Sequence, residues 1–253
     1  MRLHFSGGSK ALFMVGVLLV FAALTPAMAG TVIVGTPADA GTGNSFPFGG
    51  NYDSFADGQY QQVYTHSLFT GPITITGLEF YNTQKNEGAT AMNTGTFTIS
   101  LSTTAADWNT LSPTAASNIG GDNTLVFSGS LAQTWAFGDT LSIAFSTPFT
   151  YTPGAGANLL LNVVATGTGD AGGVIPFDTN GYNNGGLNGD TIFGRDYHNS
   201  VGYGGTPVVN SGYGLVTGFD TGGGTSATPE PATFALLGAG LAGLSLLRKR
   251  VRR

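Results

Sequence analysis

Cysteine is absent from this chain of 253 residues, and charge is scarce. The lack of thiols excludes a disulfide framework, a thiolate metal centre and a cysteine nucleophile. Charged residues make up 9% of the chain, against about 25% in a typical globular protein. The stability of any folded domain must therefore come from burial or from bound ions. Aromatic residues, at 11% of the chain, are numerous enough to build such a core.

The motifs of common hydrolases are also missing. The sequence holds no G-x-S-x-G nucleophile elbow and no H-E-x-x-H zinc motif. Beyond the first thirty residues the histidines are His66 and His198, which lack a metal-spaced partner. The acidic residues Glu79, Glu87 and the eleven aspartates mostly adjoin Gly or Asn, as turn-forming residues do. We therefore expect a protein that is not an enzyme.

Positive charge is concentrated at the two ends of the chain. Of nine Lys and Arg residues, two lie in the first ten positions and five follow Leu247. Between Gly30 and Thr228 the chain carries two basic and thirteen acidic residues, a net charge of −11, although the whole chain sums to −5. Such an acidic domain is repelled by phosphates, which argues against nucleic acid as a partner.

Residues 1–29 have the three parts of a secretory signal peptide. Two basic residues come first, residues 11–24 form an uncharged apolar helix, and the small residues Ala27 and Ala29 precede Gly30. Signal peptidase cleaves after such a small-x-small pattern. We expect export, with Gly30 as the new N-terminus.

Residues 229–253 combine a proline motif, an apolar run and a basic end. Pro229, Glu230 and Pro231 precede the uncharged run 232–247. As an α-helix this run would rise about 24 Å, somewhat less than the roughly 30 Å hydrocarbon core of a membrane. Because the run has no polar face, we expect a single transmembrane helix, with the basic end on the cytoplasmic side. That basic end comprises Arg248, Lys249, Arg250, Arg252 and Arg253.

In this order, the three features resemble the PEP-CTERM sorting segment of exported bacterial proteins. The resemblance implies that an exosortase-like membrane transpeptidase recognises Pro229, Glu230 and Pro231 and processes the protein near them. These residues would be substrate residues, not catalytic ones. It also implies an inner-membrane intermediate, followed by a place at the cell surface or in the extracellular matrix of a Gram-negative bacterium that makes exopolysaccharide or biofilm.

The Gly/Ser/Thr-rich segment 221–228 is typical of a flexible linker. Residues 30–220 have the length of one domain, and apolar residues alternate along several of its segments. In 95–104, Phe97, Ile99 and Leu101 share one face while Thr and Ser occupy the other. The segments 125–131 and 141–145 repeat this period, and 158–166 is apolar on both faces, as in a central strand.

Three further details concern the same domain. A change of parity between Ile75 and Leu78 predicts a bulge or bend at Gly77. Residues 213–219 suit the last strand, and no stretch offers a long helical stripe. The pattern predicts an all-β fold, an antiparallel β-sandwich that is jelly-roll-like or immunoglobulin-like, with its rows of Thr and Ser facing solvent.

Two binding features remain open. The segment 178–190 is rich in carboxylate and amide oxygens, and Asp178, Asn180 and Asp190 form a weak candidate site for Ca²⁺. The alternative is an ordinary Asn/Gly surface loop. Of the two tryptophans, Trp135 shares the parity of core residues, whereas Trp108 is the better candidate for an exposed sugar-stacking platform.

The sequence therefore predicts a non-enzymatic exported surface or matrix protein that signal peptidase and an exosortase-like enzyme process. The alternative is a carbohydrate-binding module for exopolysaccharide.

Overall fold

The computed structural model describes residues 30–37, 44–48, 58–83, 90–92, 94–168, 176–183, 186–187, 191–199 and 207–222. Within these ranges the chain forms β-strands and two short 3-10 helices, η2 (His66–Leu68) and η3 (Ala115–Asn118). Residues 30–222 form one compact unit. Across the described part of the chain, no helix has the length and hydrophobicity needed to cross a membrane. The predicted signal helix and the predicted transmembrane helix at 232–247 lie outside this part.

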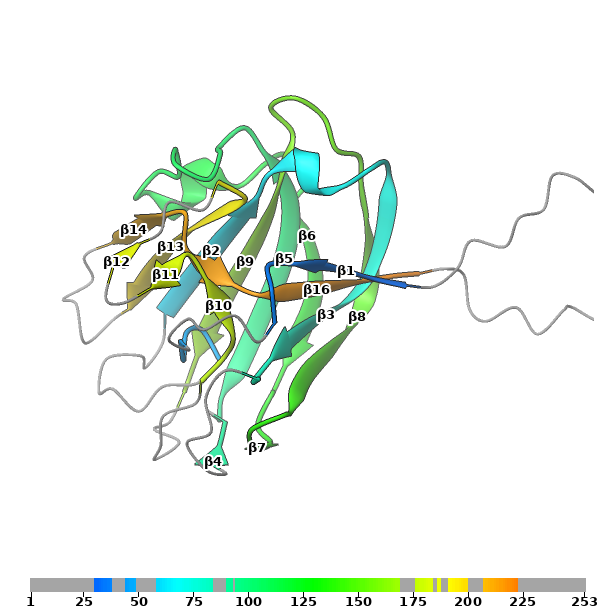
Figure 1. Ribbon diagram of the computed structural model, residues 1–253. Helices are drawn as coiled ribbons and strands as arrows, with labels where there is room; N and C mark the ends of the chain where they lie inside the picture. The colour runs from blue at the N-terminus through cyan, green and yellow to red at the C-terminus, as the bar shows by residue number, and fades with distance from the viewer. Residues whose placement is uncertain are drawn as a thin grey trace, which may run out of the picture. The chain divides into compact units, whose positions relative to one another are not determined.

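Two antiparallel sheets form the body of the domain, and their strands come from all parts of the unit (Figure 1). The strands are β1 (Gly30–Val34), β2 (Gly58–Tyr64), β3 (Ile73–Tyr81), β5 (Thr96–Thr104), β6 (Thr124–Gly129), β8 (Thr140–Tyr151), β9 (Asn158–Thr166), β13 (Phe193–Asn199), β14 (Val208–Ser211) and β16 (Thr217–Thr221). The four-stranded sheet has the order β1-β16-β3-β8, and the six-stranded sheet has the order β14-β13-β2-β9-β5-β6.

Two-stranded ribbons add to these sheets. They pair β4 (Thr90–Ala91) with β7 (Thr134–Trp135), β10 (Thr179–Asn180) with β15 (Gly214–Leu215), and β11 (Tyr182–Asn183) with β12 (Gly186–Leu187).

The hydrophobic core lies between the two sheets. Phe219 of β16 comes from the four-stranded sheet and Tyr64 of β2 from the six-stranded sheet, and their rings meet edge to face with centroids 4.9 Å apart. Leu78, Ile99 and Leu161 are also fully buried in this core. The predicted all-β, antiparallel fold is therefore confirmed, and its arrangement is that of a sandwich.

The clearest strand patterns of the sequence are confirmed. The segment 158–166 is β9, the strand between β2 and β5, and its side chains are buried on both faces. In β3 the register shifts between Ile75 and Gly77, so the predicted bulge is present. A Cβ atom on Gly77 would lie 2.8 Å from a carboxylate oxygen of Asp220, which explains why this position lacks a side chain.

The expected face of β6 is confirmed for Phe127, which packs against the core, and is wrong for Leu125. The alternation of Leu125 and Phe127 predicts that both point into the core, but Leu125 is 53% exposed and Val126 is buried instead. The cause is an irregularity opposite β5, where Ile99 pairs with Phe127 and the next residue, Ser100, pairs with Leu125. Val126 is the extra residue, and it turns inward. No glycine marks this bulge in the sequence.

The expectation that the Thr and Ser rows face solvent is also wrong for β5. Ser100 and Ser102 are buried because residues 105–123, here named the covering loop, fold back over the outer face of the six-stranded sheet. Leu111 of this loop packs on Val63 and Leu160 in a second apolar cluster.

A buried polar network holds the covering loop in place. Gln61 of β2 is completely buried. Its amide nitrogen donates to the carbonyl of Ala115 at 3.0 Å and to the Asn162 side chain at 3.0 Å. Its oxygen accepts from the Asn118 amide at 2.8 Å. Because each of these groups would be costly to leave unpaired, the network makes the covering loop an integral part of the fold.

Candidate functional site: the junction with the C-terminal segment

The fold holds the chain as far as Gly222, just before the C-terminal segment begins. The backbone N–H of Gly222 donates to the carbonyl of Thr74 in β3 at 3.0 Å. The hydroxyl of Thr76 donates to the carbonyl of Asp220 at 3.3 Å. The predicted linker is therefore tied to β3 over its first two residues, and six residues, 223–228, separate this tie from Pro229.

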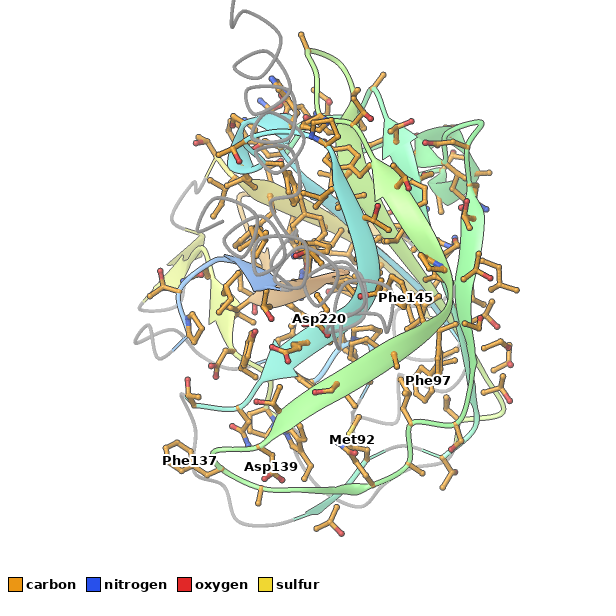
Figure 2. The ribbon with its side chains drawn as sticks, turned by 90° about the vertical axis from the view of Figure 1, so that its right-hand side faces the viewer. Met92, Phe97, Phe137, Asp139, Phe145 and Asp220 are labelled. Atoms are coloured by element: carbon orange, nitrogen blue, oxygen red, sulfur yellow. The ribbon has the colours of Figure 1, made fainter. Side chains whose placement is uncertain are left out.

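Asp220 anchors this junction from the other side. It lies on β16 between β1 and β3, and Figure 2 shows where it sits on the four-stranded sheet. Its carboxylate accepts a hydrogen bond from the Thr31 hydroxyl of β1 at 2.9 Å. The missing side chain of Gly77 leaves room for this carboxylate. The last strand is thus fixed to both neighbours.

The predicted new N-terminus lies at the same place. Gly30 pairs with Thr221 in the β1–β16 register, and the Thr221 hydroxyl donates to the Gly30 carbonyl at 2.7 Å. Ala27 and Ala29, the other residues of the predicted cleavage pattern, lie outside the described residues. The bond predicted to be cut by signal peptidase and the start of the C-terminal segment therefore adjoin the same pair of strands.

The outer face of β3 carries a hydrogen-bonded phenol–carboxylate pair. The Tyr81 hydroxyl donates to Glu79 at 2.8 Å. Burial raises the pKa of Tyr81 well above its ordinary value, and the hydrogen bond to Glu79 and the charges of Glu79 and Asp220 add to the increase. Tyr81 therefore remains a neutral donor at physiological pH, and it fixes Glu79 in place.

The candidate calcium residues act as internal hydrogen-bond acceptors where they are described. Asp178 is 1% exposed, and its carboxylate accepts from the backbone N–H of Thr83 at 2.7 Å and from the Thr83 hydroxyl. The side-chain oxygen of Asn180 accepts from the N–H of Thr36. Asp190 lies outside the described residues. Within the described ranges, no group of three His, Cys, Asp or Glu side chains is placed to hold a metal ion.

Asp178→Ala should therefore destabilise the protein by about 2–4 kcal/mol, because it removes a buried carboxylate that accepts two hydrogen bonds from the half-buried Thr83. Urea unfolding in millimolar calcium and in chelator measures this loss. We expect the same loss in both conditions. A loss seen only in calcium would instead make Asp178 a metal ligand. The control is Asp122→Ala, which removes a carboxylate at an exposed turn.

The tryptophan and histidine candidates differ in their burial and contacts. Trp135 is fully buried, as predicted. Trp108 is half-buried at the start of the covering loop, and its carbonyl lies so close to Gly194 of β13 that a Cβ there would approach to 2.0 Å. His66 is an ordinary hydrogen-bonded group whose ring contacts Asn158 at 3.1 Å. The side chain of His198 is outside the described part.

Arg195 is the feature that sequence reasoning missed. It is the one Lys or Arg among the described residues, yet it is only 8% exposed. Its guanidinium lies 4.1 Å from the ring centre of Tyr213 and 4.9 Å from that of Tyr197, and its Nε donates to Asn210 at 3.0 Å. Cation–π contact compensates part of the cost of burying the charge. The only hint in the sequence was a lone arginine in an acidic, tyrosine-rich domain.

The structure and the C-terminal sequence together define a class of protein. A compact β-sandwich ends in a strand that is hydrogen-bonded within the sheet. After this strand the sequence continues with a short Gly/Ser/Thr segment, an apolar run and a basic cluster. The protein is therefore a folded domain with a C-terminal sorting segment. Residues 227–250 match the family model of the PEP-CTERM protein-sorting motif. The match includes Pro229, Glu230, Pro231 and the basic residues as far as Arg250, whereas Arg252 and Arg253 lie beyond it.

The chain thus carries a PEP-CTERM sorting motif, as the order of its C-terminal features predicted. This motif implies export, membrane-linked sorting to the cell surface and processing by an exosortase-type enzyme. No curated protein and no solved structure matches the chain.

Proposed function

We propose that the chain is a non-enzymatic surface or extracellular-matrix protein, and that its β-sandwich is the cargo that the sorting motif delivers. The observation that carries this proposal is the sorting motif at 227–250, which begins five residues after the last residue hydrogen-bonded to the sheet. In this proposal, signal peptidase removes residues 1–29, the helix at 232–247 holds an intermediate in the inner membrane, and the basic end stays in the cytoplasm of a Gram-negative host.

The strand order supports a jelly roll rather than an immunoglobulin-like sandwich. When β1, β2, β3, β5, β6, β8, β9 and β16 are lettered B to I in chain order, the four-stranded sheet becomes B-I-D-G. The six-stranded sheet then contains C-H-E-F, with β13 and β14 added beyond strand C. This is the order of two Greek keys wound into a double sheet.

The carboxylates near loops support a structural role. Asp122 accepts from the N–H and hydroxyl of Thr103 at 2.8 and 3.0 Å. Asp139 accepts from the N–H of Ala136 at 2.8 Å and closes the turn at Gly138, where φ is 91°. A side chain that is used to close a turn is poorly placed to act as a general acid or base.

Carbohydrate binding is the second proposal, and the jelly-roll order favours it because lectin domains use this fold. It is an argument from fold alone. The covering loop occupies the outer face of the six-stranded sheet and reduces the space for a glycan there. The half-buried Trp108 is the one tryptophan that retains some exposure, so it would have to provide the stacking surface.

Surface delivery is tested by protease accessibility of the full-length chain, expressed in a bacterium that has the sorting machinery. We expect the domain to become accessible outside intact cells and to fractionate partly with extracellular polysaccharide. Retention of all the protein inside the cell envelope would contradict the proposal. Saturable binding to purified exopolysaccharide that Trp108→Ala abolishes would favour the carbohydrate-binding function over a purely structural one.

A further inference from the structure

β1 is an open edge of the four-stranded sheet. It pairs with β16 on one side, and no strand among the described ranges pairs with its other side. The opposite edge of the same sheet is different, because Ser146 of β8 donates to the carbonyl of Val126 in β6 at 3.1 Å. The β8 and β6 edges therefore lie side by side. On β1, by contrast, Gly30 and Thr31 are exposed and Ile33 is 48% exposed.

Within its five residues β1 has no charge, proline or bulge that would prevent strand pairing. Edge strands are usually protected by lysine, proline or a bulge. The sequence of β1 is Gly-Thr-Val-Ile-Val, without charge or proline, and its register with β16 runs through all five residues without a shift. Four consecutive β-branched residues also favour the extended conformation. The edge is therefore suited to accept another strand.

Charge selects the kind of strand that fits. Residues 30–228 carry a net charge of −11, so two copies repel each other when their acidic surfaces meet. β1 itself carries no charged side chain, and the Asp220 carboxylate beside it already accepts a hydrogen bond from Thr31, so the edge offers little to a basic strand. An uncharged, β-branched strand fits best, and β1 itself is such a strand. We propose that β1 pairs antiparallel with β1 of a second copy of this chain and joins two four-stranded sheets into one.

The register follows from the length of the strand. Centred on Val32, the pairing places Val32 opposite itself in the second copy, Thr31 opposite Ile33, and Gly30 opposite Val34. This register uses all five residues of β1. At one end the chain turns away at Gly35, where φ is 92°, and at the other end Gly30 is the residue expected to become the N-terminus. An isologous contact of this kind closes on itself and gives a dimer, not a fibre.

Disulfide trapping tests this register directly. Because the chain has no cysteine, Val32→Cys places its only thiol on the two-fold axis. Opposed residues in antiparallel strands have Cα atoms about 4.5–5.5 Å apart, which a disulfide can span. We expect full-length V32C, purified in mild detergent and oxidised, to run as a dimer that reductant dissociates. Ser142→Cys, exposed on β8 of the same sheet, should remain monomeric.

A second variant tests the pairing without a thiol. Ile33 is already exposed, so Ile33→Lys leaves the core unchanged but puts a cation on the pairing edge. In sedimentation we expect the dimer dissociation constant to rise at least about tenfold, while Ser142→Lys, with the same change of charge, leaves it unchanged. A monomeric wild type, an I33K dimer as tight as wild type, or a V32C crosslink to a different protein would each overturn the proposal.

Discussion

Replacement of Pro229, Glu230 and Pro231 together by Ala is expected to leave export intact and to abolish processing. The two prolines cannot donate a backbone N–H to a helix, so they keep the segment extended before the apolar run begins. An extended segment is what the active site of a protease or transpeptidase accepts. Three alanines would instead favour extension of the predicted membrane helix towards the domain, which would hide the cleavable bonds.

The unprocessed chain should then accumulate in the inner membrane, heavier than the processed protein by the mass of its tail. Mass spectrometry of the membrane and extracellular fractions measures both species. Ala in place of Gly224, Thr225 and Ser226 is the matched control, because it changes three residues just before the matched motif and should preserve processing. If the triple variant of the motif is processed and released like the wild type, the motif is not what the enzyme reads.

The junction adds a geometric condition to this prediction. Gly222 is still bonded to β3, so Pro229, seven residues further along the chain, can lie at most roughly 25 Å from it. An enzyme that acts at the motif therefore works close to the surface of a folded domain.

Local patterns of apolar residues predicted the strands that depend only on their own residues. The central strand at 158–166 agrees with β9 residue for residue, and the parity change at Gly77 agrees with the bulge of β3. Both signals come from side chains a few positions apart. The sorting segment could be predicted equally well, because its three features follow one another directly in the chain and need no tertiary contact.

The predictions that were wrong or missing concern residues whose burial depends on contacts with other parts of the chain. Ser100 and Ser102 look like solvent-facing residues until the covering loop folds over them, and nothing within β5 indicates that loop. The bulge at Val126 is set by the partner strand β5, not by a glycine in β6. Arg195 is buried because tyrosines from β13 and from the segment before β15 enclose it. In each case at least one decisive neighbour lies outside the strand itself.

Trp135→Ala is expected to cause the largest loss of stability of any single substitution considered, about 3–5 kcal/mol. The indole is completely buried, its Nε1–H donates to the carbonyl of Pro176 at 2.9 Å, and its ring lies 4.7 Å from that of Phe177. Phe177 in turn contacts Phe48 and Phe80, at 5.7 and 6.4 Å between ring centroids. Removing the indole therefore leaves a large cavity at one end of the aromatic core, and it also leaves a buried carbonyl without its donor.

Two further variants separate these contributions in urea unfolding of the full-length chain. Trp135→Phe keeps an aromatic ring but loses the N–H donor, so about 1–3 kcal/mol of the loss should remain. Trp108→Ala removes the half-buried tryptophan from the covering loop and should cost clearly less than W135A. With two tryptophans in the chain, W108A also leaves Trp135 as the only indole, whose fluorescence should shift to the red when the core opens. Equal losses for W135A and W108A would contradict the placement of Trp135 in the core, because only a buried indole leaves a cavity of that size.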